Sequence, residues 1–160
     1  MERYQRQIIL PGIGTSGQQK LKSSSVLVVG AGGLGCAVLP YLAAAGIGKI
    51  GIIDGDKIEE SNLHRQVLYS ADQIGLYKVK EAADTIIKKN PGVEVLVFEE
   101  FLTEKNASEI FQHFDLIIDA TDNLFIRYVI NDTCEDSGKP FIYGSIHQFQ
   151  GQISVFNFQG

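Results

Sequence analysis

The segment of residues 26–35 constrains the fold of this chain more than any other part of the sequence. Four apolar residues run directly into Gly-Ala-Gly-Gly-Leu-Gly, so an apolar strand is followed by the pattern G-x-G-x-x-G. In this pattern Gly30 would make a tight turn, Gly32 would let the backbone approach a phosphate, and Gly35 would let the next helix pack against its strand. The N–H groups at the start of that helix attract an anion. The segment therefore predicts a strand–turn–helix unit that binds a nucleotide.

Short apolar runs alternate with segments of helical periodicity along the rest of the chain, and this alternation is typical of a parallel sheet. The predicted helices are Lys78–Lys89, Thr103–Phe111 and Asn123–Ser137. The predicted strands are Val26–Gly30, Lys49–Asp54, Val93–Phe98, Asp115–Asp119, Phe141–Ser145 and Gln152–Phe158. The first four have the composition of strands buried on both faces, and the last alternates as an antiparallel strand would. The predicted fold class is α/β, a Rossmann-like mostly parallel sheet with flanking helices.

Composition and charge argue against several partners and compartments. A net charge of −5 without a block of like charges gives no reason to expect nucleic acid or a membrane as partner. Cys36 and Cys134 are the only cysteines, and both fall in predicted helices, so neither a disulfide framework nor a zinc site is indicated. The longest apolar run is too short to span a bilayer. These features favour a cytoplasmic location.

The length suits one compact domain, and we expect residues 1–160 to form a single nucleotide-binding domain. Residues 1–25 would form an N-terminal helical segment of that domain. The final strand reaches the end of the sequence without a cap or a further element. We therefore expect a truncated chain or an isolated domain, with a small protein that simply stops there as the alternative.

Polar residues follow several of the predicted strands, at the edge where open parallel sheets bind ligands. Asp54 follows Gly35 by 19 residues, a position from which a carboxylate meets a ribose hydroxyl, and Asp56 comes next. Arg65 and Lys78 could neutralise the charge that shifts toward pyrophosphate when a triphosphate is cleaved. Binding NAD requires neither cation. This edge therefore favours ATP over NAD.

Asp122 lies after the fourth predicted strand and could hold Mg²⁺, which takes one or two carboxylates together with phosphate oxygens. Thr121, Asp122 and Asn123 are also all good N-cap residues, so Asp122 could instead cap the following helix. Taken alone, Arg65 and Lys78 could likewise be solvated surface charges.

Several motifs, in order along nearly the whole chain, resemble one enzyme family. They are Arg3-Tyr-Gln-Arg6-Gln-Ile-Ile-Leu10, the glycine motif, Asp54-Gly-Asp56, Ser61-Asn-Leu-His-Arg65-Gln66, Gly75-Leu-Tyr-Lys78 and Asp119-Ala-Thr-Asp122-Asn123. The family is that of the MoeB/ThiF/HesA-like adenylyltransferases, relatives of the ubiquitin-activating enzymes. The resemblance implies that ATP and Mg²⁺ are used to adenylate the C-terminal glycine of a ubiquitin-like sulfur-carrier protein ending in Gly-Gly.

The resemblance also implies the roles of individual residues. Asp54 would bind the ribose, the Gly32–Gly33 backbone would approach the phosphates, and Asp122 would ligate Mg²⁺. The phosphate contacts would come from Asn62, Arg65, Gln66 and Lys78, with Asp56 beside them. Arg6 resembles the arginine finger that reaches the ATP of the other subunit, which implies a homodimer. The two C-x-x-C pairs that bind zinc in most bacterial relatives, and the crossover loop near them, do not occur in this sequence, so no zinc is expected in this chain.

Two other interpretations remain open from the sequence. The glycine motif and Asp54 would also suit an NAD-dependent oxidoreductase, although 160 residues leave no room for a separate substrate domain. A non-catalytic scaffold member of the same family is the second alternative. The presence of Arg6, Arg65, Lys78 and Asp122 argues against the scaffold.

Overall fold

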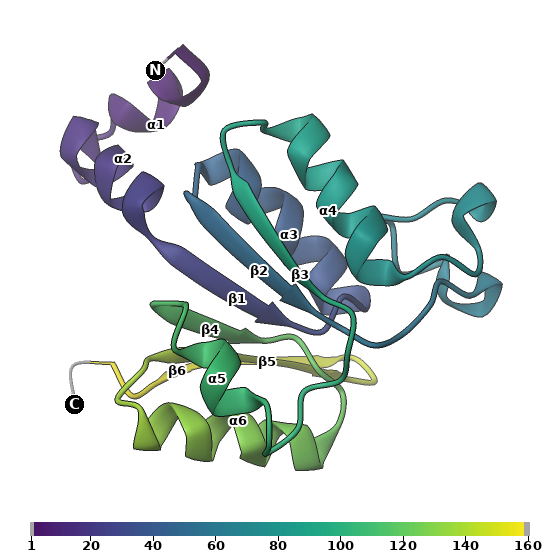
Figure 1. The fold of residues 1–160 in the computed structure, drawn as a ribbon. Helices are drawn as coiled ribbons and strands as arrows, with labels where there is room; N and C mark the ends of the chain where they lie inside the picture. Colours follow the sequence, from purple (N-terminus) through teal and green to yellow (C-terminus); the bar gives the residue numbers. More distant parts are fainter. Residues whose placement is uncertain (1, 159–160) are drawn as a thin grey trace.

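The computed structural model describes residues 2–158 as one six-stranded sheet with helices on both of its faces (Figure 1). This arrangement confirms the predicted Rossmann-like α/β class with a mostly parallel sheet. The predicted domain of 1–160 includes Met1, Gln159 and Gly160, which lie outside the described residues, so its extent stays a prediction.

The order of the strands places a binding crevice near the middle of the sheet. The strands are β1 (Ser25–Val29), β2 (Lys49–Ile53), β3 (Glu94–Phe98), β4 (Leu116–Asp119), β5 (Phe141–His147) and β6 (Gln150–Phe156). They follow the order β3-β2-β1-β4-β5-β6, in which β6 alone is antiparallel to its neighbour. The chain moves outward from β1 in one direction to β3 and then returns to β4 on the other side of β1. Such a switch point opens a crevice at the carboxyl ends of the strands.

The helices form a layer on each face of the sheet. The helices α3 (Gly33–Ala45) and α4 (Lys78–Lys89) cover one face, and α5 (Ala107–Phe111) and α6 (Leu124–Asp136) cover the other (Figure 1). Each layer has its own apolar core, because alternate residues of the buried strands point to opposite faces. Leu27 and Val29 belong to the core under α5 and α6, whereas Val26 and Val28 belong to the other.

The chain begins with short helices at the end of the sheet opposite the crevice. They are η1 (Glu2–Tyr4), α1 (Gln5–Ile8) and α2 (Gly14–Ser23), and α2 leads directly into β1 (Figure 1). Gln7 donates a hydrogen bond to the carbonyl of Ala45, the last residue of α3, at 2.8 Å. The N-terminal helices are thereby fixed to the far end of α3.

Several predicted elements differ from those observed. β5 extends two residues beyond the predicted Ser145, to His147. The helix expected over 103–111 begins at Ala107, because the Asn106 side chain accepts hydrogen bonds from the N–H and hydroxyl of Thr103 and closes a turn before it. The last strand spans 150–156 and not 152–158, and it ends where Asn157 adopts φ +53°. β3 is half exposed and not buried on both faces, because it forms the edge of the sheet.

Cys36 in α3 and Cys134 in α6 are buried free thiols. Burial raises the pKa of the Cys134 thiol to about 12, and it also raises the pKa of Cys36. Both side chains are therefore protonated at neutral pH and pack as small apolar groups. Between residues 2 and 158, no helix combines the length and the apolar character that crossing a bilayer requires.

Candidate functional site

A cleft of about 850 Å³ lies beyond the carboxyl ends of β1, β2 and β4. Sequence analysis predicted ten site residues, and the structure brings nine of them together on the walls of this one cleft. These nine are Gly32, Gly33, Asp54, Asp56, Asn62, Arg65, Gln66, Lys78 and Asp122. They come from five separate segments of the chain, and the switch point of the sheet is what gathers them.

The glycine motif forms a tight turn between β1 and α3. Gly30 adopts φ +97°, and a Cβ atom there would lie 2.9 Å from the carbonyl oxygen of Ala120 on the neighbouring β4 connection. A Cβ atom on Gly35 would collide with the Gly30 carbonyl oxygen. Gly32 precedes the first residue of α3 and supplies no side-chain cap, so the first backbone N–H groups of this helix are available to a ligand. The turn therefore has the form that the motif predicts.

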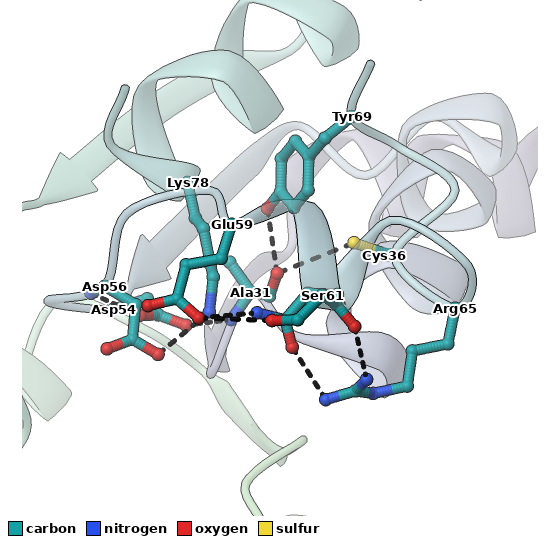
Figure 2. Close-up of polar contacts among 10 residues, drawn as sticks. Ala31, Cys36, Asp54, Asp56, Glu59, Ser61, Arg65, Tyr69 and Lys78 are labelled. Atoms are coloured by element: carbon teal, nitrogen blue, oxygen red, sulfur yellow. Dashed lines mark hydrogen bonds and ion pairs between the residues drawn. The ribbon is translucent and has the colours of Figure 1, made fainter. Parts of the chain in front are cut away.

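Ala31, inside this turn, is held on both sides by hydrogen bonds (Figure 2). Its N–H donates to Oδ2 of Asp54 at 2.7 Å, and its carbonyl accepts from the hydroxyl of buried Tyr69 at 2.8 Å. The second oxygen of Asp54 accepts the N–H of Asp56 at 2.7 Å. Each Asp54 oxygen keeps one further lone pair, which leaves the carboxylate able to accept from a ribose hydroxyl.

Lys78 is the first residue of α4, and its ammonium reaches back to the connection that follows β2. Nζ lies 2.8 Å from Oδ2 of Asp56 (Figure 2). The Lys78 side chain is only 6% exposed, whereas the Asp56 side chain is 54% exposed. A buried ammonium at the wall of the cleft, with one carboxylate partner among residues 2–158, is placed to bind an anionic ligand.

Arg65 belongs to a chain of polar contacts on the same wall. Its guanidinium donates to Oδ1 of Asn62 at 2.7 Å, and the Asn62 amide donates to Glu59 at 3.3 Å. Arg65 is exposed, so its guanidinium can turn toward a ligand without breaking a buried contact. Gln66 is only 3% exposed, and its Oε1 has no hydrogen-bond partner among residues 2–158. The Gln66 residue also lines the cleft.

The connection after β4 forms the opposite wall. Asp119 is 1% exposed, and burial raises the pKa of its carboxyl, while hydrogen bonds from Thr121 and the charge of Arg127 oppose that rise. The Asp119 carboxyl group thus accepts hydrogen bonds from Thr121 within the connection and does not line the cleft.

Asp122 follows on this wall and is exposed to the cleft. Asn123, and not Asp122, caps α6: its Oδ1 accepts the N–H groups of Phe125 and Ile126 at 2.9 and 3.3 Å. Within the part of the chain that the structure describes, the Asp122 carboxylate makes no hydrogen bond or ion pair. The structure thus decides against the capping role that the sequence left open for Asp122.

The residues of the cleft fit Mg²⁺ only where a bound ligand supplies part of the coordination. Among residues 2–158, no group of three or more His, Cys, Asp or Glu side chains is placed to hold a metal. Mg²⁺ commonly binds through one or two carboxylates, phosphate oxygens and water. The Asp122 carboxylate, without a partner among residues 2–158, suits that kind of site if the ligand supplies phosphate oxygens.

Several residues on the cleft walls were not predicted. Arg127 in α6 lines the cleft, as do Lys57, Glu59 and Phe101. The spacing of Arg127 offered a signal, because it lies one helical turn after the cap residue Asn123 and so faces the same strand ends. Phe101, 62% exposed, lies against Gly55, and its place in a connection without periodicity gave no sequence signal.

Arg6 is the one predicted site residue that lies outside the cleft. It is an exposed residue of α1, which is attached to the C-terminal end of α3 (Figure 1). The cleft contacts the N-terminal end of α3, about 18 Å away at the rise of an α-helix. Arg6 therefore does not contribute to the cleft of its own chain.

Comparison with known proteins gives a consistent relationship along the chain. The sequence model of the ThiF family matches residues 4–160. A probable molybdopterin-synthase adenylyltransferase from Porphyra purpurea is 52% identical over 99% of this chain and 41% of its own length. A sulfur carrier protein adenylyltransferase from Thermus thermophilus is 48% identical over 98% of this chain and 58% of its own length. The chain thus spans roughly half the length of these curated relatives.

A solved structure of similar fold contains a nucleotide. It is the E. coli tRNA N6-threonylcarbamoyladenosine dehydratase TcdA in complex with ATP, which superimposes with a TM-score of 0.86 at 28% identity. The match covers 96% of this chain and 65% of that chain.

Proposed function

The chain belongs to the ThiF family, and we propose on this basis that it catalyses the ATP-dependent adenylation of the C-terminal glycine of a ubiquitin-like sulfur-carrier protein ending in Gly-Gly. The two curated relatives described above are named adenylyltransferases, and one is named for a sulfur carrier protein. The observation that carries the proposal is the one cleft that holds the glycine turn, Arg65, Lys78 and the Asp122 carboxylate, which has no partner among residues 2–158.

The proposed reaction requires no nucleophilic side chain. The carrier's carboxylate, ionised at neutral pH, attacks the α-phosphorus of ATP and forms a new oxygen–phosphorus bond. The bond from the α-phosphorus to the bridging oxygen breaks, and its electron pair leaves with pyrophosphate. The products are an acyl-adenylate and pyrophosphate. The protein contributes by positioning the reactants and stabilising charge.

Each wall of the cleft would then have its own part in the reaction. The Asp54 carboxylate would bind the ribose, and the free N–H groups at the start of α3 would bind phosphate oxygens. Arg65 and Lys78 would neutralise the negative charge that moves toward pyrophosphate. Asn62 and Gln66 would add neutral contacts to the phosphates, and Asp56 would hold the Lys78 ammonium in place.

Mg²⁺ is part of the proposal, with Asp122 as the residue that would hold it. The ion would supply positive charge beside the phosphates. The unpaired state of the Asp122 carboxylate among the described residues supports this role.

The two alternatives are less well supported. An NAD-dependent oxidoreductase would not need the cations Arg65 and Lys78, and the relatives carry the names of adenylyltransferases. A non-catalytic scaffold would not need to keep nine predicted site residues on one cleft.

We also propose a homodimer in which Arg6 completes the cleft of the partner subunit. Its distance from the cleft of its own chain supports action between subunits. Mixing Arg6→Ala and Asp122→Ala chains tests this idea, because a mixed dimer contains one intact site. About a quarter of the wild-type activity should return from random pairing, and no recovery would contradict action between subunits.

A cytoplasmic location is proposed as well, because both cysteines are buried free thiols. Nucleic acid and membranes are not proposed as partners, since the net charge is −5.

The central experiment measures carrier-dependent exchange of radiolabelled pyrophosphate into ATP, with a sulfur-carrier protein ending in Gly-Gly and a carrier lacking its last glycine. The intact carrier alone should support exchange. Arg65→Ala should slow exchange by about 10²–10³ and remain folded, because Arg65 is exposed. Lys80→Ala removes an exposed cation on α4 outside the cleft and serves as the matched control. Near-normal exchange by Arg65→Ala would contradict its role.

A further inference from the structure

Thr121, just before Asp122, is held by hydrogen bonds on both of its sides. Its N–H and its hydroxyl both donate to Oδ1 of buried Asp119, at 2.9 and 2.7 Å. Its carbonyl accepts from the guanidinium of Arg127 at 2.6 Å. Because that carbonyl belongs to the peptide that joins Thr121 to Asp122, the direction in which Asp122 leaves the connection is fixed by these contacts.

Arg127 makes this contact from α6, and its guanidinium also contacts two strands of the sheet. A second nitrogen donates to the hydroxyl of Tyr143 on β5 at 2.9 Å, and the guanidinium lies 4.9 Å from the centre of the Tyr143 ring. Nε faces Oδ2 of Asp119 at 3.9 Å, and these two atoms are buried and lack a hydrogen-bond partner among residues 2–158. One side chain thus connects the β4 connection, α6 and β5. A lysine has no planar fork with which to do so.

Asp122 lies between two fixed neighbours while its own carboxylate is unpaired. Thr121 is fixed by Arg127 and Asp119, and Asn123 is fixed as the cap of α6. The direction of the Asp122 Cα–Cβ bond is therefore set by the backbone on either side, and the carboxylate makes no contact of its own within the described chain. This is the arrangement expected of a group that must be pre-positioned for a ligand.

We infer that Arg127 is a positioning residue that orients Asp122 by fixing the Thr121 carbonyl, with Asp119 as its buried counter-charge. The inference rests on the proposed function only in taking Asp122 as the residue that holds the metal. The positioning itself is a property of the protein without nucleotide.

Hydrogen–deuterium exchange of the nucleotide-free chain tests the positioning directly. Arg127→Lys keeps the positive charge but loses the fork, so amides of residues 120–126 should exchange roughly tenfold faster, while β1 and α4 remain protected. Tyr143→Phe removes a different Arg127 contact and leaves Thr121 untouched, so this matched control should exchange like the wild type. Unchanged exchange over 120–126 in Arg127→Lys, or a general rise across the whole chain, would overturn the inference.

Calorimetric titration with ATP, in Mg²⁺ and in EDTA, tests the consequence for metal binding. Arg127→Lys should lower the ratio of the dissociation constant in EDTA to the dissociation constant in Mg²⁺, and Asp122→Asn should lower it as well. The dissociation constant in EDTA should stay within about twofold of the wild-type value. The double variant should lose no more metal dependence than Asp122→Asn alone, because both changes act through the same carboxylate. Additive losses would overturn the inference. A wild-type chain that binds ATP without any metal dependence would instead overturn the proposed role of Asp122 in metal binding, and the exchange experiment would still decide whether Arg127 positions the connection.

Discussion

The carboxylate of Asp54 accepts the N–H of Ala31 at 2.7 Å, so the end of β2 is joined to the glycine turn that follows β1. This contact connects the two parts of the nucleotide-binding pattern that lie 23 residues apart. One side chain thereby shapes the turn that would receive the phosphates and presents an acceptor for a ribose. Binding of both the phosphates and the ribose of a nucleotide should therefore depend on Asp54.

Asp54→Asn should destabilise the fold and weaken ATP binding at the same time. Both Asp54 oxygens accept backbone N–H groups, so an asparagine must turn its NH₂ group toward one of these donors. The free energy of unfolding, measured with urea, should fall by about 1–3 kcal/mol. Glu60→Gln in η2 (Glu60–Asn62) is an exposed control that should change neither quantity. An unchanged stability in Asp54→Asn would show that the contact with Ala31 is not maintained.

The ion pair of Lys78 and Asp56 should respond differently to loss of each partner. Asp56→Ala leaves the buried ammonium unpaired and should cost about 3 kcal/mol of stability. Lys78→Met leaves only a solvent-exposed carboxylate, so stability should change by less than about 1 kcal/mol. Exchange of pyrophosphate into ATP should nevertheless fall by about 10²–10³ in Lys78→Met. Urea denaturation and the exchange assay separate the two effects, and equal destabilisation by both variants would contradict this account.

Gly35→Ala should disrupt the junction of β1 and α3. The added methyl group would collide with the Gly30 carbonyl oxygen, which belongs to the backbone and cannot move aside. We expect a loss of about 3 kcal/mol or more in the free energy of unfolding, together with loss of ATP binding. Gly12→Ala is the matched control, because a methyl group there meets nothing within 4 Å. Its stability should stay within about 0.5 kcal/mol of the wild type.

Asp115 should make the stability of the protein dependent on pH at the acidic end. The hydroxyl and N–H of Ser25 donate to this carboxylate at 2.7 and 2.8 Å, and they lower the pKa of Asp115. The ionised form is thus favoured by folding, and its stabilisation is present above the unfolded pKa near 4. It is lost as the pH falls through the lower pKa of the folded state.

Asp115→Asn should therefore lower the free energy of unfolding by about 1 kcal/mol at pH 7, a modest value because the carboxylate is largely exposed. The difference from the wild type should shrink toward zero near pH 2. Urea denaturation between pH 2 and 7 measures it. Asp84→Asn, on the exposed side of α4, serves as the control, and a difference in Asp115→Asn that does not depend on pH would contradict the role of ionisation.

The local part of the fold could be predicted from sequence because it depends on near neighbours. The apolar runs of β1, β2 and β4 and the stripe of Val79, Ala82 and Ile86 in α4 are buried as their periodicity predicts. Ile87 continues the same helical spacing in the sequence, yet it is 45% exposed. The bounds of the last strand depended on the left-handed conformation at Asn157, which amide contacts with Cys134 and Lys139 support from a distance in sequence.

Residue types and spacing determined which side chains could bind a nucleotide, because a glycine turn, a carboxylate after the second strand and two cations are chemical requirements visible in the sequence. The tertiary structure decided how these groups are used. It showed that Asn123 caps α6 while Asp122 has no partner in the described part of the chain. It also showed that Lys78 is buried against Asp56 and that Arg6 lies far from the cleft of its own chain. It also revealed Arg127, whose contacts with Thr121, Asp119 and Tyr143 join β4, α6 and β5. Such contacts depend on which strands become neighbours, and strand order is fixed by packing across the whole sheet and not by local sequence.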